Sequence, residues 1–421
     1  MRKFFFLLFA AFFSVSLFGT YILVPMDNFQ KNHLKSYGIA YWVLSNDIEV
    51  QWLLNYRGGS FLFQYNKQLA LECTTRDVTF ETLPDAQVAA LLDEISNPEV
   101  NQDAIKLQKA PRMAVYSPKG KQPWDDAVTL VLTYAEIPYD VIYDEEILSD
   151  VLPKYDWLHL HHEDFTGQYG RFYSSYRNAP WYKAEVKSNE DMAKKLGYGK
   201  VSQMKLAVAQ KIRDYCFGGG FLFAMCSASD SYDVALAAEG VDICADIFDY
   251  DAADPSMNKK IDYSKCFAFE NFTLSTNPYE YEFSSIDTYN SRSAAGVSKE
   301  NDFFTLFDFS AKWDPVPSML CQNHETMIKG FWGQTVGYDK RYIKKNVLVM
   351  GENKSINEAR YIHGEFGKGT WSFYGGHDPE DYQHRVEDPP TDLKLHPNSA
   401  GYRLILNNVL FPAAKKKKRQ T

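Results

Sequence analysis

The sequence is informative first for what it lacks. Its six cysteines include no Cys-x-x-Cys pair, and no His-Glu-x-x-His run of a zinc protease occurs. There is no internal repeat and no low-complexity tract. Positive charge is also in deficit, since 45 Lys and Arg residues face 54 Asp and Glu residues, for a net charge of −9. This acidic balance argues against a general nucleic-acid-binding protein. The partner that we predict is a small-molecule substrate, an amide or a carbohydrate.

Long apolar runs are scarce too, and the clearest one opens the chain. Arg2 and Lys3 precede a stretch rich in Phe and Leu over residues 4–18. This arrangement is typical of a signal peptide, and the apolar stretch is short for a membrane-spanning helix. We therefore predict a signal peptide over residues 1–20 and an exported protein, periplasmic or secreted, with envelope association. An uncleaved membrane anchor is the alternative.

Residues 21–110 form a distinct N-terminal accessory region in the predicted organisation. Its clearest element is an amphipathic helix over residues 83–95, in which apolar residues from Val88 to Ile95 share one face. This helix precedes a change of pattern near residue 111.

Beyond that point the pattern is that of an α/β domain. Strand-like runs over residues 113–116, 139–143 and 155–160 alternate with helical segments. Alternation of this kind predicts a doubly wound, mostly parallel sheet, in which ligands bind at the carboxyl ends of the strands. We predict that this domain spans residues 111–412 and contains two inserted segments, at about residues 165–200 and about 245–340. A basic tail follows over residues 413–421.

One strand-to-helix transition stands out within this domain. Three glycines, Gly218 to Gly220, lead into an apolar run that ends at Cys226, and a helical segment follows over residues 230–238. A sharp turn from strand to helix exposes the residue at the turn beside backbone N–H groups that stabilise a thiolate or an oxyanion. Cys226 is therefore a candidate nucleophile, with Ser227 beside it in substrate binding. The alternative is a buried core cysteine.

A second motif supplies the groups that such a nucleophile requires. Residues 375–380 read Gly-Gly-His-Asp-Pro-Glu and follow another strand-like run. A nucleophilic cysteine needs a base within hydrogen-bond reach and an acid that orients the base. We therefore predict His377 as the base of Cys226, with Glu380 or Asp378 as the acid.

These two motifs carry a family resemblance. The Gly-Gly-His-Asp-Pro-Glu run resembles the His-Pro-Glu signature of class I glutamine amidotransferases, and Cys226 stands where their nucleophile elbow lies. Ala224 and Ala228 replace the flanking glycines of that family, and Asp378 adds one residue between the histidine and the acid. The Gly-Lys-Gly, strand, Gly-His-Asp order over residues 366–378 is similar to the ThuA-like branch of this superfamily. The resemblance implies a flavodoxin-like fold and either hydrolysis of an amide or ester or a carbohydrate-related role.

The N-terminal region carries a second resemblance. Residues 25–27, 33–38 and 52–60 are similar to a group of exported bacterial proteins labelled "asparagine synthetase B". The chemistry of that label requires a Cys exposed as the mature N-terminal residue and a Ser-Gly-Gly-x-Asp-Ser loop that binds pyrophosphate. Neither motif is present. We therefore interpret the label as a family name.

Histidines and acids cluster at the end of the strand over residues 155–160. His159 and His161 would share one strand face, which suits two imidazoles on one ion. A divalent metal is one interpretation of this pair, packed histidines are the alternative, and no other cofactor is predicted. His162 and Glu163 follow at the strand end and are expected to line the substrate edge.

The first inserted segment is rich in Tyr, Trp and Arg, and Arg171 within it suits a carboxylate or a sugar. Three functions stay open from the residues. The first is a cysteine-dependent hydrolase or amidotransferase, the second is a ThuA-like protein that binds or processes carbohydrate, and the third is a non-catalytic envelope binding protein.

Overall fold

The computed structural model describes residues 20–120, 122–321, 325–383 and 385–414. The predicted signal peptide and the predicted basic tail lie outside these ranges, apart from Thr20, Ala413 and Ala414. Within the described ranges, no helix is both long enough and apolar enough to cross a membrane.

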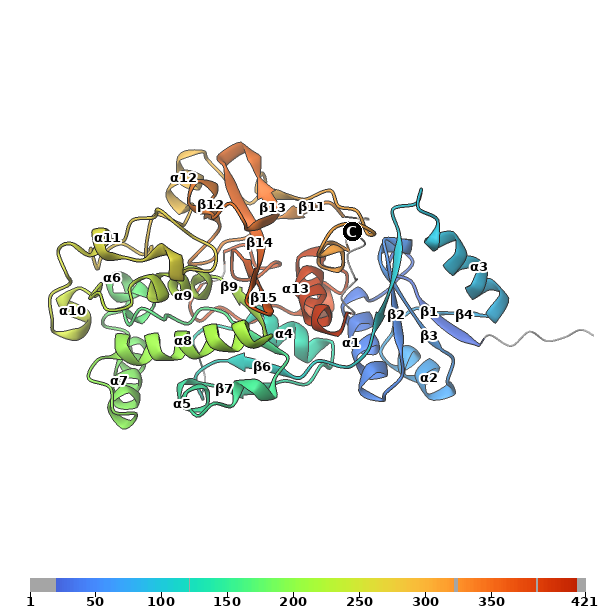
Figure 1. Cartoon of the computed structure of the whole chain (residues 1–421), viewed down its shortest axis with the longest axis horizontal. Coiled ribbons are helices and arrows are strands. Elements are labelled where there is room, and N and C mark those ends of the chain that lie inside the picture. Colours follow the sequence, from blue (N-terminus) through green and yellow to red (C-terminus); the bar gives the residue numbers. More distant parts are fainter. Residues whose placement is uncertain (1–19, 121, 322–324, 384, 415–421) are drawn as a thin grey trace, which may run out of the picture.

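A small antiparallel sheet forms one end of the molecule (Figure 1). Its five strands lie in the order β4-β1-β3-β2-β5, and every neighbouring pair is antiparallel. The strands and the helices of this region are β1 (Tyr21–Val24), α1 (His33–Ser45), β2 (Val50–Leu54), β3 (Ser60–Gln64), α2 (Lys67–Thr75), β4 (Glu81–Leu83), α3 (Asp85–Ser96) and β5 (Asp103–Leu107). Helix α3 confirms the predicted amphipathic helix, since Val88 and Ile95 are buried on one face.

The larger sheet is mixed, with ten strands. Its strands are β6 (Met113–Tyr116), β7 (Asp140–Ile142), β8 (Trp157–Leu160), β9 (Phe221–Met225), β10 (Phe303–Leu306), β11 (Met327–Lys329), β12 (Tyr338–Asp339), β13 (Leu348–Asn353), β14 (Glu358–Phe366) and β15 (Gly369–Tyr374). The run β15-β9-β8-β6-β7 is parallel throughout, whereas β11, β10, β13 and β14 extend it with antiparallel pairs and β12 pairs with β14. The predicted α/β fold with a parallel sheet is confirmed, and the antiparallel extension adds to it. The extension begins at the β14–β15 hairpin, where Gly367 has a φ of +62°, because a tight turn can join only antiparallel strands.

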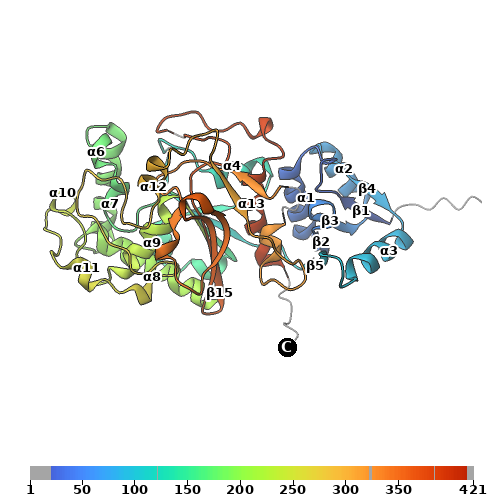
Figure 2. The same ribbon diagram turned by 90° about the horizontal axis from the view of Figure 1, so that it is seen from above.

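Helices cover both faces of the parallel strands (Figures 1 and 2). The helices of this part are α4 (Ala127–Tyr134), α5 (Asp144–Leu148), α6 (Tyr173–Tyr176), α7 (Pro180–Lys195), α8 (Val201–Gly218), α9 (Ser227–Ala237), α10 (Asp246–Asp249), α11 (Met257–Lys260), α12 (Tyr289–Ala294) and α13 (Ala400–Leu410). Along β9, Phe221 and Phe223 pack in one core with α4 and α13, and Leu222 and Ala224 pack in another with α8 and α9. The alternation explains why β9 is apolar at every position: both of its faces are buried.

The N-terminal sheet shares its core with the α/β part. Trp52 and Phe61 from the small sheet belong to the same buried cluster as Leu404 of α13. Arg403 of α13 is fully buried. Its guanidinium donates to the carbonyl oxygen of Gly58 and to that of Met26, the latter at 3.2 Å. The two sheets are therefore joined by one continuous apolar core.

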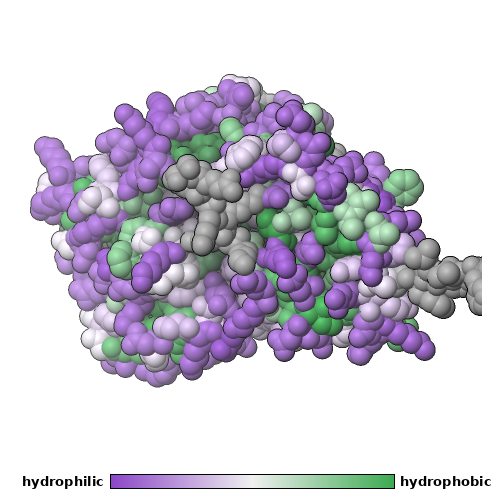
Figure 3. Space-filling model, turned by 45° about the vertical axis from the view of Figure 1, so that its right-hand side comes forward, coloured by the Kyte–Doolittle hydropathy of each residue, from purple (hydrophilic) through white to green (hydrophobic). Residues whose placement is uncertain are grey.

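The two predicted inserted segments pack against each other at the opposite end of the molecule. One small apolar cluster contains Tyr182 of α7, Phe248 of α10 and Cys244, which precedes α10. Figure 2 places α6, α7, α10 and α11 at the end that lies away from the small sheet. On the face drawn in Figure 3, hydrophilic residues predominate and hydrophobic ones gather in a few separate areas.

Candidate functional site

The candidate site lies where four neighbouring parallel strands end. Cys226 follows β9 directly, His161 follows β8 directly, and His377 comes three residues after the end of β15. Asp125 and Asp126 lie in the connection from β6 to α4. Because β15, β9, β8 and β6 are adjacent and parallel, their carboxyl ends share one edge of the sheet, which is the edge where folds of this kind bind ligands.

Cys226 has a strained backbone at the turn into α9. Its φ of +51° and ψ of −143° lie outside the regions that residues with a side chain favour. Neighbouring groups fix the turn, since the Ala228 N–H donates to the His161 carbonyl at 2.9 Å and the Ser229 hydroxyl donates to the Cys226 carbonyl at 2.7 Å. Strain held in this way is characteristic of functional positions.

The Cys226 sulfur has two polar neighbours. The Gln334 backbone N–H donates to Sγ at 3.2 Å, and His377 lies within hydrogen-bond reach of the same atom. Both side chains are well covered, with Cys226 exposing 2% and His377 exposing 6% of its surface. The structure thus brings the predicted nucleophile and the predicted base together. Gln334 belongs to the second inserted segment, so this segment covers the elbow.

The carboxylate beside His377 is Asp125. Its Oδ1 lies 3.8 Å from Nε2 of His377. Burial disfavours the charged imidazolium, but hydrogen bonds and charge from Asp125 and Cys226 outweigh burial and raise the pKa of His377 to about 10. His377 is therefore protonated at neutral pH in this arrangement and faces a carboxylate on one side and a sulfur on the other.

The two acids predicted from the sequence have other partners. Glu380 Oε2 lies 3.1 Å from Nδ1 of His396. Asp378 is buried and accepts hydrogen bonds from the Thr391 hydroxyl at 2.7 Å and from the Glu380 N–H at 2.8 Å, so it fixes the turn after His377. Asp125 was visible in the sequence only as an acid near a helix start, and its proximity to His377 depends on the order of the strands.

The predicted substrate-binding residues occupy different environments. Ser227 is the first residue of α9, and its buried hydroxyl has no hydrogen-bond partner among the described residues. Glu163 accepts from the Tyr143 hydroxyl at 3.2 Å, and burial raises the pKa of Glu163 to about 7. Arg171 is fully buried, and its guanidinium donates to carbonyl oxygens of the second inserted segment, such as Asn277. Arg171 therefore ties the two inserted segments together.

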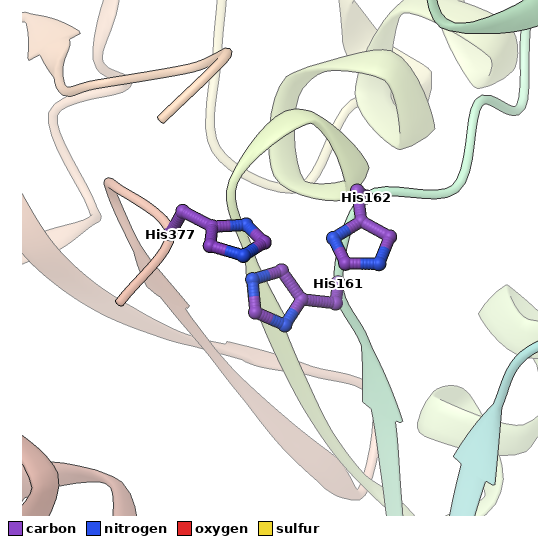
Figure 4. Close-up of side chains that lie close together, drawn as sticks. All are labelled: His161, His162 and His377. Carbon is purple, nitrogen blue, oxygen red and sulfur yellow. The ribbon is translucent and has the colours of Figure 1, made fainter. Parts of the chain in front are cut away.

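Three histidines meet at this edge. Figure 4 shows the rings of His161 and His162, from the end of β8, close to the ring of His377. The centroid distances are 4.4 Å for His161–His162, 4.6 Å for His161–His377 and 5.2 Å for His162–His377. Burial lowers the pKa of His161 to about 4 and that of His162 well below its usual value, so both rings are uncharged at neutral pH.

His159 lies deeper than this group. Its Nε2 is 3.3 Å from Asp126 Oδ2, and its Nδ1 is 3.1 Å from the Phe223 carbonyl oxygen. Asp126 in turn caps α4 by accepting from the N–H groups of Val128 and Thr129 at 2.7 and 3.0 Å. The predicted pair His159 and His161 therefore shares a strand face, but the polar atoms around His159 already have protein neighbours.

No cysteine of the described ranges forms a disulfide bond, and this includes Cys226. All six lie within the described ranges, and all are buried and free. Cys226 is therefore available as a thiol in this structure.

These features define the class of the protein: it is an α/β protein with a mixed, largely parallel sheet and a separate small antiparallel N-terminal sheet. No family model and no curated protein matches the chain. Among solved structures, it is distantly similar to "Cytoplasmic Protein STM3548" from Salmonella typhimurium, with 11% identity, a TM-score of 0.34, and 73% of this chain and 100% of that chain covered. A second similar structure is "Cytoplasmic Protein STM1381" from Salmonella typhimurium LT2, with 11% identity, a TM-score of 0.30, and coverage of 72% and 99%.

A third similar structure is Gan42B, a GH42 β-galactosidase. It has 11% identity and a TM-score of 0.25, and the match covers 64% of this chain and 28% of the enzyme. At these identities the comparisons concern the fold alone.

Proposed function

We propose that this chain is an exported, amidotransferase-like cysteine hydrolase that cleaves an amide or ester bond of a small molecule. The observation that carries the proposal is the geometry at Cys226: a strained turn at a helix start, a backbone N–H on the sulfur and His377 beside it. Nucleophile, base and orienting acid are then Cys226, His377 and Asp125, a set that matches the logic of known catalytic triads.

The reaction follows from these positions. The Cys226 sulfur attacks the substrate carbonyl carbon and forms a C–S bond, while the thiol proton resides on His377. Collapse of the tetrahedral intermediate breaks the C–N or C–O bond, and His377 gives its proton to the departing amine or alcohol. Water then attacks the thioester carbon, with His377 accepting a proton from the water. The C–S bond breaks, the Cys226 sulfur takes back the proton from His377, and the carboxylic acid product leaves.

The start of α9 supplies stabilisation for the oxyanion. The Ser227 N–H belongs to the first turn of the helix, where N–H groups have no partner within the helix. The positive end of the helix dipole adds to this effect. Because the Ala228 N–H is already bound to the His161 carbonyl, the Ser227 N–H is the donor that we assign to the oxyanion.

Access to this site depends on the segment around Gln334. Its side chain donates to the Gly170 carbonyl, and its N–H donates to the sulfur. A substrate therefore displaces Gln334 from Cys226 before it can react. A small acyl group suits this covered edge better than a polymer does.

The test is the rate at which iodoacetamide alkylates each cysteine of the native protein, followed by peptide mass spectrometry. We expect Cys226 to react faster than the other five cysteines. His377→Ala should lower the alkylation rate of Cys226 and leave the rates of the other five cysteines unchanged. Asp125→Asn should also lower the rate of Cys226. Glu380→Gln is the matched control and should leave the rate unchanged, because Glu380 is paired with His396.

Substrate turnover then completes the test. A panel of small amides and esters should identify an activity that falls about 10²–10⁴-fold in His377→Ala, the range that general base catalysis contributes. If Cys226 reacts no faster than the buried core cysteines, the hydrolase proposal fails and a non-catalytic binding protein becomes the better description.

A carbohydrate-related function is the second candidate, in line with the ThuA-like resemblance. Its support is Trp124, whose ring lies 5.2 Å from that of His162 and whose buried Nε1 has no hydrogen-bond partner among the described residues. Aromatic rings beside polar groups are suited to sugars. A shift in melting temperature with simple sugars, lost in Trp124→Phe, is the expected result for this candidate.

A further inference from the structure

We infer that His161, His162 and His377 form a binding site for a divalent transition metal ion such as Zn²⁺. The inference goes beyond the proposed hydrolase, because it concerns a ligand of the three imidazoles and does not need the chemistry of Cys226.

The three rings converge from two different strands. One nitrogen of each ring can be chosen so that the three atoms all lie within 4.8 Å of one another. Zinc–nitrogen bonds measure about 2.0–2.1 Å, so ligand nitrogens on one ion are separated by about 3.3–3.5 Å in a tetrahedral arrangement. Small rotations of the side chains are therefore sufficient to place all three nitrogens on one ion.

The polar atoms of the cluster support the same inference. His161 exposes 1% of its surface, and its Nε2 has no hydrogen-bond partner among the described residues. Nδ1 of His162 is likewise buried and lacks a partner there. Buried polar atoms are normally satisfied, so two such atoms in adjacent rings indicate a ligand that the protein atoms alone do not supply.

Second contacts orient the ring of His161. Its Nδ1 lies 3.1 Å from Asp126 Oδ1, which leaves Nε2 for the ion. A carboxylate behind a metal-binding histidine is the usual way in which proteins fix the tautomer and raise the basicity of the ligand. Asp126 is itself fixed as the cap of α4.

The arrangement is that of a site with an open position. The other two groups of candidate ligands are occupied by protein contacts: His159 and Asp126 bind each other, and Asp242 and Asp249 flank the Lys200 ammonium at 2.6 and 3.0 Å. Three histidines leave a fourth coordination position for water or for a ligand. Binding of the ion would displace the proton that His377 carries in the metal-free arrangement, and His377 would then no longer act on Cys226.

Titration of the full, chelator-treated protein with Co²⁺ tests the site, because tetrahedral Co²⁺ absorbs visible light, and competition with Zn²⁺ gives the zinc affinity. We expect one ion per chain. His162→Gln should weaken binding at least about tenfold, the scale on which lost ligand support acts. His396→Gln is the matched control, since His396 pairs with Glu380 outside the cluster.

Three further measurements separate this inference from the proposed hydrolase. Cys226→Ser should retain metal binding, and His162→Gln should retain rapid alkylation of Cys226. Zn²⁺ should slow that alkylation in the wild type and not in His162→Gln. The three-histidine site is overturned if no ion binds, if the affinity is unchanged in both His162→Gln and His161→Gln, or if binding is lost in Cys226→Ser. An inert Cys226 with intact metal binding overturns only the hydrolase.

Discussion

The strain at Cys226 gives a prediction that needs no substrate. A residue with a side chain at this φ and ψ costs about 1–3 kcal/mol relative to a favourable backbone conformation. Glycine removes this cost, because it lacks the Cβ atom that clashes there. We therefore compare Cys226→Gly with Cys226→Ala, two variants that both lack the sulfur and its hydrogen bond to Gln334.

Ala228→Gly is the matched control. Ala228 is as buried as Cys226 but lies within α9, where glycine is less favourable than alanine by about 1 kcal/mol and loses about 0.8 kcal/mol of methyl burial. The same losses apply at position 226, so the difference between the two Ala-to-Gly effects isolates the strain. We expect this difference to be about 1–3 kcal/mol in favour of glycine at position 226.

Guanidinium unfolding followed by tryptophan fluorescence measures these free energies. From these figures, Cys226→Gly should lie between about 0.8 kcal/mol less stable and about 1.2 kcal/mol more stable than Cys226→Ala, whereas Ala228→Gly should be about 1.8 kcal/mol less stable than the wild type. Equal losses at the two positions would show that the turn stores no strain. In that case Cys226 would be an ordinary core cysteine at the end of a strand.

Three further predictions concern other parts of the molecule. Lys205→Met should lower the free energy of unfolding by about 3–5 kcal/mol, because it leaves the fully buried Asp144 carboxylate without its ammonium partner at 2.9 Å; guanidinium unfolding measures this, and a double variant with Asp144→Leu should recover part of the loss. Burial lowers the pKa of His363 to about 3, so the unfolded chain takes up a proton between pH 6.5 and 3 and stability falls with falling pH. His363→Asn should remove about 2 kcal/mol of the difference between pH 8 and pH 5, and an unchanged pH profile would contradict this. Gly333→Ala should slow alkylation of Cys226, because the added Cβ would lie 2.8 Å from the His377 backbone nitrogen; a wild-type rate would show that the loop adjusts freely.

Local sequence patterns predicted the central elements well. The apolar run after the three glycines is β9 in the structure, the segment after Cys226 is α9, and the amphipathic segment near residue 90 is α3. These elements follow from short-range periodicity and from turn residues, which the chain carries within a few positions. The proximity of Cys226 and His377 followed from a second rule, that neighbouring parallel strands end at one edge.

The rest of the site depends on long-range order that no local pattern contains. Asp125 is 252 positions before His377 in the sequence, and only the strand order β15-β9-β8-β6 brings the two loops together. Glu380 was closer in sequence to the histidine, but the turn fixed by Asp378 directs it toward His396. The rings of His162 and His377 stack for the same reason, since β8 and β15 both flank β9.

The shared core has a consequence for how the chain is made. Helix α1 of the N-terminal region packs against α13, and Tyr37 donates a hydrogen bond to Asn407, although α13 follows every strand of both sheets. During synthesis, this contact can form only after α13 has left the ribosome, because Tyr37 and Asn407 are 370 positions apart. Contacts of such long range form late and slow the folding of a chain, so the part of the core between α1 and α13 is completed at the end of synthesis.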